Sequence, residues 1–345
     1  NSSSTEEETK QLNKIIFIHM HRVIYDFRNK KISNLTSYDI KANLLCCFIL
    51  NNISKKNIDF INLIILNQID KLGMHKSYNI LEHAKFMNNL GEIKNIFLYF
   101  NANISVNIEE NIFRMQSILN EYFHDDGSIP LFNGSNNNYT ELIYNSLNKD
   151  EYLKSRKFIN INNGIAFYSD KQKRVFFDIV QPTKDNISYN LNAGTLSFEF
   201  SCLGEKIITN CGASESFGKN PEYLRYSAAH STIILQNTNI SEIKENNPHK
   251  KFPQSVVFNR DSFDDNVIFE GSHNGYVKKF SKILKRKLVI SQNDNKIIGE
   301  DSIISLKNTN NRIFYHIRFH LVDGISYNFT NNKRNVILRT KLNKM

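Results

Sequence analysis

The fold class of this 345-residue chain is indicated by Asn190-Leu-Asn-Ala-Gly-Thr-Leu-Ser-Phe-Glu199 and by the two segments that follow it, Lys206-Ile-Ile-Thr209 and Arg225-Tyr-Ser-Ala-Ala-His-Ser-Thr232. Residues 195–200 and 206–209 have the period of two and the β-branched and aromatic content of strands. Between them, Leu203-Gly204-Glu205 is a turn sequence. The stretch therefore predicts an antiparallel hairpin.

Further strand-like runs lie on both sides of this hairpin. They cover residues 164–168, 174–180, 232–235, 255–258, 287–291 and 312–319. Many short strands with turn residues between them and no helices in between are typical of an antiparallel sandwich.

Before about residue 155 the apolar period is that of helices. Ile108, Ile112, Met115 and Leu119 recur at steps of four and three, and residues 42–50, 58–69 and 81–90 show the same pattern. The connections are short, so we expect antiparallel helical hairpins. We expect the first 35 or so residues to be frayed at their start.

The change of period places a domain boundary near residue 155. We predict an α+β chain with a helical domain over residues 1–155 and a β-sandwich over residues 156–345. The chain begins at Asn1 without a methionine and ends after a basic, strand-like segment. We expect the helical domain to be truncated at its N-terminus and the sandwich at its C-terminus.

Composition narrows the function classes. There are 44 Lys and Arg against 34 Asp and Glu, a net charge of +10, which favours an anionic partner; a lysine-rich proteome is the alternative. Basic residues at 278, 279, 282 and 285–287 have the spacing of an outward strand face. Clustered basic and aromatic residues that would bind a nucleic acid are absent.

No apolar run reaches the roughly 18 residues of a transmembrane helix. The four cysteines are too few to indicate a disulfide framework, and we expect Cys202 and Cys211 to be free thiols.

General catalytic motifs do not identify a reaction. The sequence has no phosphate loop, no dinucleotide fingerprint, no His-Glu-x-x-His, no Cys-x-x-Cys pair and no Gly-x-Ser-x-Gly. The 10 histidines are too widely spread for spacing to reveal a metal cluster.

Several ordered motifs resemble those of the heparinase II/III family. The stretch at 190–199 resembles the signature His-x-His-x-Asp-x-Leu-Ser-Phe-Glu, and those at 207–212 and 225–232 resemble the following strand and the Ala-His-Asn-Thr motif. Asp125-Asp-Gly-Ser-Ile-Pro-Leu-Phe-Asn-Gly134 resembles the loop that closes the helical domain, and Gly73-Met-His75 an earlier loop. Residues 272–276, 299–301 and 318–320 resemble later landmarks of the sandwich, so the resemblance covers residues 70–330.

This resemblance implies an incomplete α/α toroid joined to an antiparallel β-sandwich. It also implies β-elimination of acidic, uronate-containing polysaccharides such as heparan sulfate or alginate. That reaction needs donors that neutralise the uronate carboxylate, a base that takes the C5 proton, and an acid at the leaving oxygen.

The metal-binding part of the signature differs in this chain. The family positions that can together hold zinc read Asn192, Asn210 and His230. Neutral amides are poor zinc ligands, and one imidazole cannot make the site. We therefore predict no metal and no cofactor.

The resemblance suggests six site residues, each with a simpler alternative. His230, His75 and Tyr78 are the candidates for proton transfer; a buried histidine, a loop histidine and a packing tyrosine are the alternatives. Asn190 and Asn192 could bind a carboxylate but are also turn formers. Arg225 could pair with a substrate acid or form a salt bridge inside the sandwich. Leu196, Phe198 and Glu199 are interpreted as strand packing and pairing.

Two functions follow from this interpretation. The first is a polysaccharide lyase that acts on an acidic polysaccharide, located in the cell envelope or periplasm, although a cytoplasmic location stays open. The second is a non-catalytic glycan-binding or envelope-structural protein on the same scaffold, favoured by the loss of both signature histidines. The glycan, the cleaved bond and the oligomeric state are not specified by the sequence.

Overall fold

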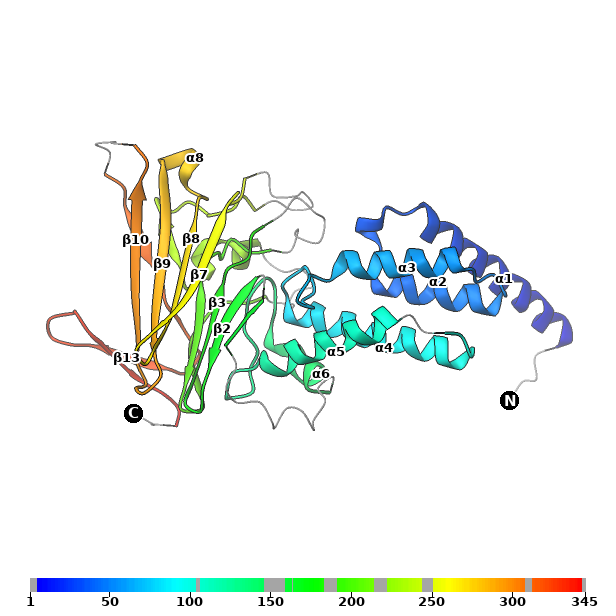
Figure 1. Ribbon diagram of the computed structural model, residues 1–345, viewed down its shortest axis with the longest axis horizontal. Coiled ribbons are helices and arrows are strands. Elements are labelled where there is room, and N and C mark those ends of the chain that lie inside the picture. Colours follow the sequence, from blue (N-terminus) through cyan, green and yellow to red (C-terminus); the bar gives the residue numbers. More distant parts are fainter. Residues whose placement is uncertain are drawn as a thin grey trace. The chain divides into compact units, whose positions relative to one another are not determined.

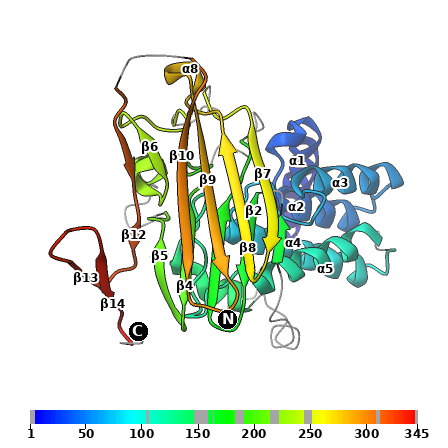
Figure 2. The ribbon, with the colours of Figure 1, turned by 60° about the vertical axis from the view of Figure 1, so that its left-hand side comes forward.

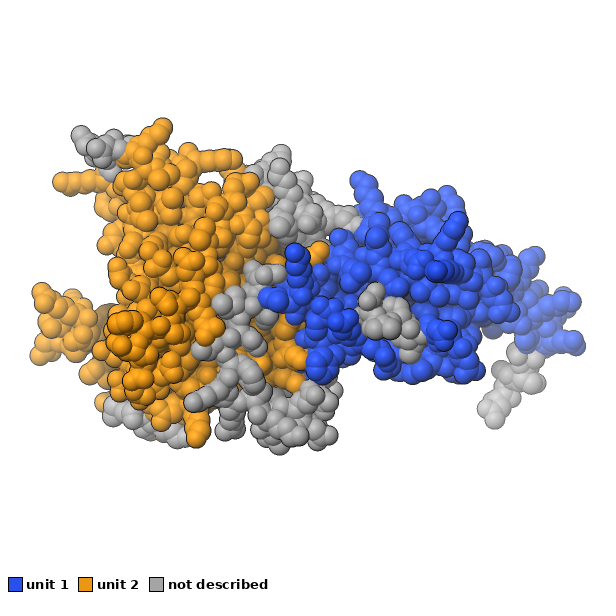
Figure 3. Space-filling model, in the orientation of Figure 1, with its two compact units in different colours: residues 1–73, 85–116 blue, residues 74–84, 117–345 orange. Residues whose placement is uncertain are grey.

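The computed structural model describes residues 5–103, 106–145, 159–162, 164–182, 191–213, 222–243, 251–307 and 312–342. These residues form two compact units (Figure 3). Unit 1 comprises residues 1–73 and 85–116, and unit 2 comprises residues 74–84 and 117–345. The predicted boundary at 155 falls outside the described residues and stays a prediction.

Unit 1 is helical, and its helices start at capping residues that the sequence supplies. The helices are α1 (Glu6–Asn29), α2 (Ser37–Ile49), α3 (Lys55–Gln68), most of α4 (Ile80–Tyr99) and most of α5 (Val106–Glu121) (Figure 1). Thr5 and Thr36 form capping boxes with Glu8 and Asp39, and Ser54 caps α3. Such caps satisfy backbone N–H groups that have no partner within the helix.

The predicted fraying concerns the start of the chain; residues 1–4 lie outside the described residues, and α1 begins at Glu6. The Thr5–Glu8 capping box and three glutamates in the first turn favour an early start. None of the helices in the described residues is long and apolar enough to cross a membrane.

Unit 2 contains the sheets. The larger sheet has the order β1-β2-β3-β4-β5-β12, and the smaller has the order β10-β9-β8-β7, whose four strands lie side by side in Figure 2. All paired strands are antiparallel, as in β9 with β10. The strands are β1 (Ile159–Asn162), β2 (Ile165–Ser169), β3 (Lys173–Asp178), β4 (Phe198–Cys202), β5 (Glu205–Thr209), β7 (Val256–Phe263), β8 (Asn266–His273), β9 (Lys282–Ser291), β10 (Ile297–Ser305) and β12 (His320–Leu321).

Shorter elements complete the unit. β6 (Ile233–Leu235) pairs with β11 (Tyr315–Ile317), and β13 (Ser326–Phe329) pairs with β14 (Val336–Arg339). The helices are α6 (Thr140–Asn145) and α8 (Val277–Phe280), with 3₁₀ turns at Asn137–Tyr139, Glu222–Arg225 and Ser227–Ala229.

The two main sheets pack face to face around one apolar core. Val175, Phe177 and Phe198 from the larger sheet meet Phe269 and Leu288 from the smaller one. The helices-then-sandwich fold is thus confirmed. The opposite face of the larger sheet is also buried, because Tyr122 packs against Phe167 and Phe176.

Two basic residues that were predicted to face outward are buried in the structure. Burial alternates along β9, and Lys282 and Arg286 belong to its buried set together with Leu284 and Leu288. The prediction that residues 278–287 present one outward basic face is therefore wrong for Lys282 and Arg286. Cys202 and Cys211 are free thiols, as predicted.

Candidate functional site

Residues 191–197 and 225–232, here called the corner, are held together by hydrogen bonds in unit 2. The N–H of Ala193 donates to the carbonyl oxygen of Arg225 at 2.9 Å, and Ser227 Oγ donates to the carbonyl oxygen of Ala193 at 2.7 Å. Thr232 Oγ1 donates to Thr195 O at 3.1 Å. The two motifs singled out by the sequence thus form one rigid element.

Arg286 fixes the corner from inside the sandwich. Its Nη1 donates to Leu196 O at 3.0 Å and to Ser231 O at 2.7 Å, one carbonyl from each corner segment. Its Nε and Nη2 form a bidentate pair with Asp301 at 2.7 and 2.9 Å. Leu196 also has a left-handed backbone, with φ of 62°. Such a conformation is costly for leucine and persists only when its surroundings enforce it.

Glu199 is the centre of a buried polar network, which strand packing alone does not describe. Its Oε1 accepts from the backbone N–H of Leu131 and of Asn210 at 3.0 and 2.9 Å. Its Oε2 lies 2.6 Å from Lys206 Nζ and 3.1 Å from His124 Nε2. The network joins the loop after α5 to β4 and β5.

The charges of this network determine its protonation. Burial alone would raise the pKa of Glu199, but Lys206 and the hydrogen bond from His124 hold it well below its ordinary value. Burial and the charge of Lys206 lower the pKa of His124. Because the carboxylate only accepts, the neutral imidazole carries its proton on Nε2, and Nδ1 accepts from Ser201 Oγ at 3.0 Å.

The imidazole of His230 is buried in the corner. Its side chain is 1% exposed, and neither ring nitrogen has a partner among the described residues. Gly194 packs against the ring, since a Cβ at that position would lie 2.9 Å from His230 Cγ. Burial, with a contribution from His320, lowers the pKa of His230 to about 3, so the imidazole is neutral at pH 7.

The side chain of Asn192, on the other corner segment, is likewise buried without a hydrogen-bond partner among the described residues. It is 5% exposed, and neither Oδ1 nor Nδ2 has a partner in the described part of the chain. A buried polar group without a partner costs about 1–3 kcal/mol. Native proteins therefore satisfy nearly all such groups, and exceptions are candidates for binding a ligand.

Asn133 connects the corner to the loop that contains His75 and Tyr78. Its Oδ1 accepts from the N–H of Asn192, and its Nδ2 donates to the carbonyl oxygen of Tyr78, both at 3.3 Å. The Tyr78 ring packs on Gly164, where a Cβ would lie 2.3 Å from Tyr78 Cδ1. The structure thus places Tyr78 and Asn192 around one asparagine.

His75 is buried beside two polar groups. Its Nδ1 lies 2.8 Å from Ser77 Oγ, and its backbone N–H donates to His83 Nδ1. Burial and His83 lower the pKa of His75 to about 3. No hydrogen bond in the described residues joins His75 or Tyr78 to His230.

Arg225 and Asn190 are the two remaining predicted site residues. Arg225 is part-buried and its Nη2 donates to Leu191 O at 3.3 Å, so its guanidinium helps to hold the corner. Burial lowers the pKa of Arg225. Asn190 lies outside the described residues.

The three positions of the family's zinc site do not fit a zinc ion. Asn210 uses its amide within the protein: Nδ2 donates to Glu199 Oε1 at 3.1 Å, and Oδ1 accepts from the N–H of Ser231 at 2.9 Å. Asn192 is a neutral amide, which leaves His230 as the one good zinc ligand of the three. Metal analysis of the purified protein tests the prediction that zinc is absent.

Three residues of the site were missed as functional positions: Asn133, Glu199 and Arg286. Each lies in a motif or charge pattern already quoted, at 125–134, 190–199 and 282–287. The signal for Arg286 was Asp301 in the Gly-Glu-Asp landmark, because a buried arginine needs a carboxylate partner.

Comparisons with known proteins agree with this architecture. The family described as "Heparinase II/III-like, C-terminal" matches residues 161–344. No curated protein matches the chain. Among solved structures, heparan sulfate lyase HepC from Pedobacter heparinus is similar, with 13% identity, a TM-score of 0.66 and coverage of 88% of this chain and 50% of that one.

Two further solved structures are similar to a comparable degree. One heparinase III has 14% identity, a TM-score of 0.64 and coverage of 88% of this chain and 53% of that one. A second heparinase III has 11% identity, a TM-score of 0.65 and coverage of 93% and 53%. The chain thus spans about half the length of the solved structures it matches.

Proposed function

The chain belongs to the heparinase II/III-like family, and from this membership we propose that it is a polysaccharide lyase-like protein for an acidic, uronate-containing polysaccharide. The named relatives include a heparan sulfate lyase, which supports a sulfated or carboxylated glycan as the partner. The proposed reaction is β-elimination.

In this reaction a base removes the C5 proton of the uronate, the C4–O bond breaks, and a double bond forms between C4 and C5. The leaving oxygen takes a proton from an acid. The C5 proton becomes acidic only when donors stabilise the charge that develops on the carboxylate. We assign this role to Asn192, Asn190 and Arg225.

We assign proton transfer to His230, His75 and Tyr78. Because burial keeps His230 and His75 neutral, each imidazole has a lone pair that can accept a proton. A bound carboxylate would raise the pKa of a nearby imidazole through its opposite charge. Substrate binding would thus improve the base that it needs.

One observation carries the proposal: the side chains of Asn192 and His230 are buried and have no hydrogen-bond partner among the described residues, inside a corner that hydrogen bonds hold together. A rigid surrounding with two unused polar side chains is the arrangement expected of a preorganised ligand site.

The test is incubation with a panel of acidic polysaccharides while the ultraviolet absorbance of the unsaturated product is followed. We expect turnover of at least one glycan and a loss of about 100-fold or more in His230→Gln, the range usual for a proton-transfer group. His273→Gln is a matched control, because His273 is also buried with a pKa lowered to about 3 but lies outside the corner. No turnover across the panel, or equal rates in both variants, would contradict the proposal.

A glycan-binding protein without catalysis is the second candidate. It is favoured by the 1% exposure of His230 and by asparagines at both signature histidine positions. Glycan-array binding that persists in His230→Gln, with no turnover in either protein, would select this function.

We also propose a location in the cell envelope or periplasm, where a protein meets extracellular polysaccharides. Fractionation of cells that produce the protein tests this location, and recovery in the cytoplasmic fraction alone would contradict it.

A further inference from the structure

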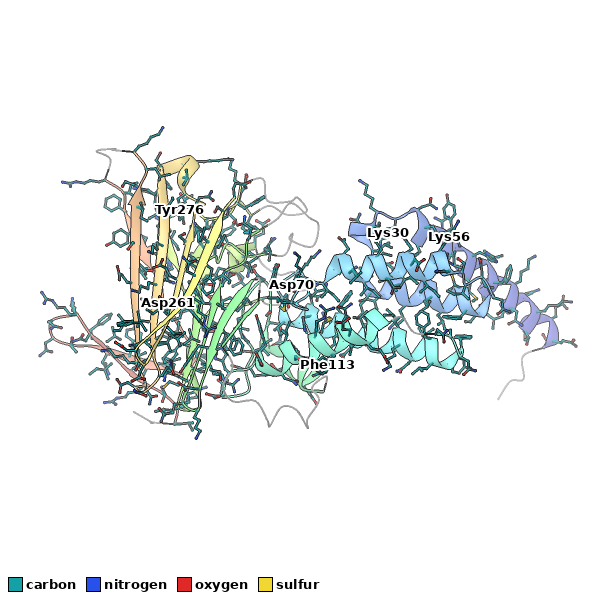
Figure 4. The ribbon with its side chains drawn as sticks, in the orientation of Figure 1. Lys30, Lys56, Asp70, Phe113, Asp261 and Tyr276 are labelled. Atoms are coloured by element: carbon teal, nitrogen blue, oxygen red, sulfur yellow. The ribbon has the colours of Figure 1, made fainter. Side chains whose placement is uncertain are left out.

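A second candidate binding site lies where β8 passes through α8 into β9. A pocket of about 520 Å³ opens there, within the range of about 300–1,000 Å³ typical of small-ligand sites. Tyr276, labelled in Figure 4, marks this end of the sandwich. The lining comes from residue 226 and from segments 238–243, 251–254 and 274–279. None of the five predicted site residues that the structure describes lines it.

Two asparagines of the pocket have their amide oxygens fixed by the backbone. Asn239 Oδ1 accepts from the N–H of Ser227 at 3.0 Å. Asn274 Oδ1 accepts from the N–H groups of Gln254 and Ser255 at 2.8 and 3.0 Å. Because each oxygen is engaged, the orientation of each amide is set, and the NH₂ groups are the ends available to a ligand.

Ser241 adds a buried hydroxyl to the same lining. It is 2% exposed, and its Oγ has no hydrogen-bond partner in the described part of the chain. This is the same feature that marks Asn192 in the corner. A polar ligand in the pocket would satisfy this hydroxyl.

The charge of the pocket is positive. Lys251, Lys278 and Lys279 line it together with one acid, Glu242. Lys279 Nζ donates to Thr238 Oγ1 at 3.0 Å. Lys251 and Lys278 are exposed, and among the described residues neither has an ion-pair partner. Two free ammonium groups and two oriented NH₂ groups make a site of donors, which suits oxyanions.

The pocket also offers aromatic surface. Tyr226 and Phe252 are partly exposed in its lining. Tyr226 belongs to the corner segment 225–232 and also lines the pocket, so the pocket adjoins the segment that carries His230. Amphipathic rings beside polar donors provide both an apolar face and hydrogen bonds.

We propose that this pocket binds a carboxylated or sulfated sugar unit of the polysaccharide, as an anchoring site that adjoins the proposed catalytic corner and uses none of its assigned catalytic residues. The inference rests on the proposed function for the choice of glycan. Binding in the pocket does not require turnover in the corner.

The experiment is calorimetric titration of the whole chain with a sulfated, uronate-containing tetrasaccharide. We expect Lys251→Ala/Lys278→Ala to weaken binding about tenfold, since loss of two charge-assisted contacts is worth about 1.4 kcal/mol or more. Lys14→Ala/Lys171→Ala removes the same net charge from exposed positions outside the pocket and should bind like the wild type. A neutral tetrasaccharide and inorganic sulfate serve as the other two ligands.

Equal affinity in the pocket variant and the wild type would overturn the inference, as would equal binding of the neutral tetrasaccharide. Weakening of the same size in the control variant would do so too, because it would indicate a general charge effect. If sulfate alone competes fully at low concentration, the site takes simple anions and the saccharide assignment is wrong. Absence of turnover together with tenfold weaker binding in the pocket variant would reject the lyase function and retain the pocket.

Discussion

His124 and His230 are equally buried in unit 2 but have opposite surroundings. His124 donates to Glu199 and accepts from Ser201, so both ring nitrogens are paired. His230 is 1% exposed, and neither of its ring nitrogens has a hydrogen bond among the described residues. Both imidazoles have lowered pKa values because burial disfavours their charged forms.

This difference in hydrogen bonding indicates a different role for each region. The network around His124 joins the strands of the larger sheet to the loop after α5. Both ring nitrogens of His124 are hydrogen-bonded to other residues of the protein, so neither is available to a ligand. The corner around His230 is also held by hydrogen bonds, but the side chains of His230 and Asn192 have no partner among the described residues and can still bind a ligand. Burial identifies neither role, whereas the pairing of the polar atoms distinguishes them.

The largest effect is expected at the centre of the paired region. Glu199→Ala removes the carboxylate that faces Lys206 and His124 and leaves a buried ammonium without a counter-charge. Breaking a buried ion pair in this way costs about 3–5 kcal/mol. Urea denaturation of the variant and the wild type measures the loss in the free energy of unfolding. A loss below about 1 kcal/mol would mean that the network does not hold the sheet.

Arg286→Met tests how firmly the unpaired corner is held. The change removes the donors to Leu196 O and Ser231 O and leaves Asp301 unpaired. We expect a loss of about 2–3 kcal/mol in the free energy of unfolding, less than at Glu199 because Asp301 is partly exposed. The double variant Arg286→Met/Asp301→Leu should recover part of this loss in urea denaturation, since no lone buried charge remains. Equal losses in both variants would contradict this account.

The sequence predicted much of the fold because periodicity is a local property. The period of two and the turn at Leu203-Gly204-Glu205 located β4 and β5 to within a few residues. The ordered landmarks identified the family, which residues 161–344 confirm.

The pairing of polar groups could not be predicted because it depends on contacts far apart in sequence. Glu199 meets His124 across 75 residues, and Arg286 reaches Leu196 across 90. Alternation along residues 282–291 fits either orientation of β9, so it did not show that Arg286 faces inward. For the same reason the sequence suggested Asn192 and His230 as site residues but did not show that their side chains are buried without hydrogen-bond partners among the described residues.

The pH dependence of the free energy of unfolding tests whether His230 is buried and neutral. Its pKa of about 3 in the folded state lies below the 6.5 of the unfolded chain, so the unfolded state takes up a proton first as the pH falls. Stability is therefore lost below pH 6.5, by about 2 kcal/mol at pH 5 for this one group. His230→Gln should lose about 2 kcal/mol less than the wild type between pH 7 and pH 5 in urea denaturation. Identical pH dependence would show that His230 is protonated or exposed in the folded protein.

The smallest change in stability is expected at Asn192, and its direction decides the interpretation of the corner. Asn192→Ala keeps the backbone N–H that donates to Asn133 and removes an amide without partners. Since no paired group is lost, we expect a change within about 1 kcal/mol, which includes a gain in stability. Active sites often show this trade-off, because groups kept for a ligand are strained or unsatisfied without it. Thermal denaturation measures the change in stability, and glycan titration measures the change in affinity. We expect weaker binding at nearly unchanged stability. A loss of more than about 2 kcal/mol would instead show that the amide is paired in the folded protein, and the corner would then resemble the region of His124.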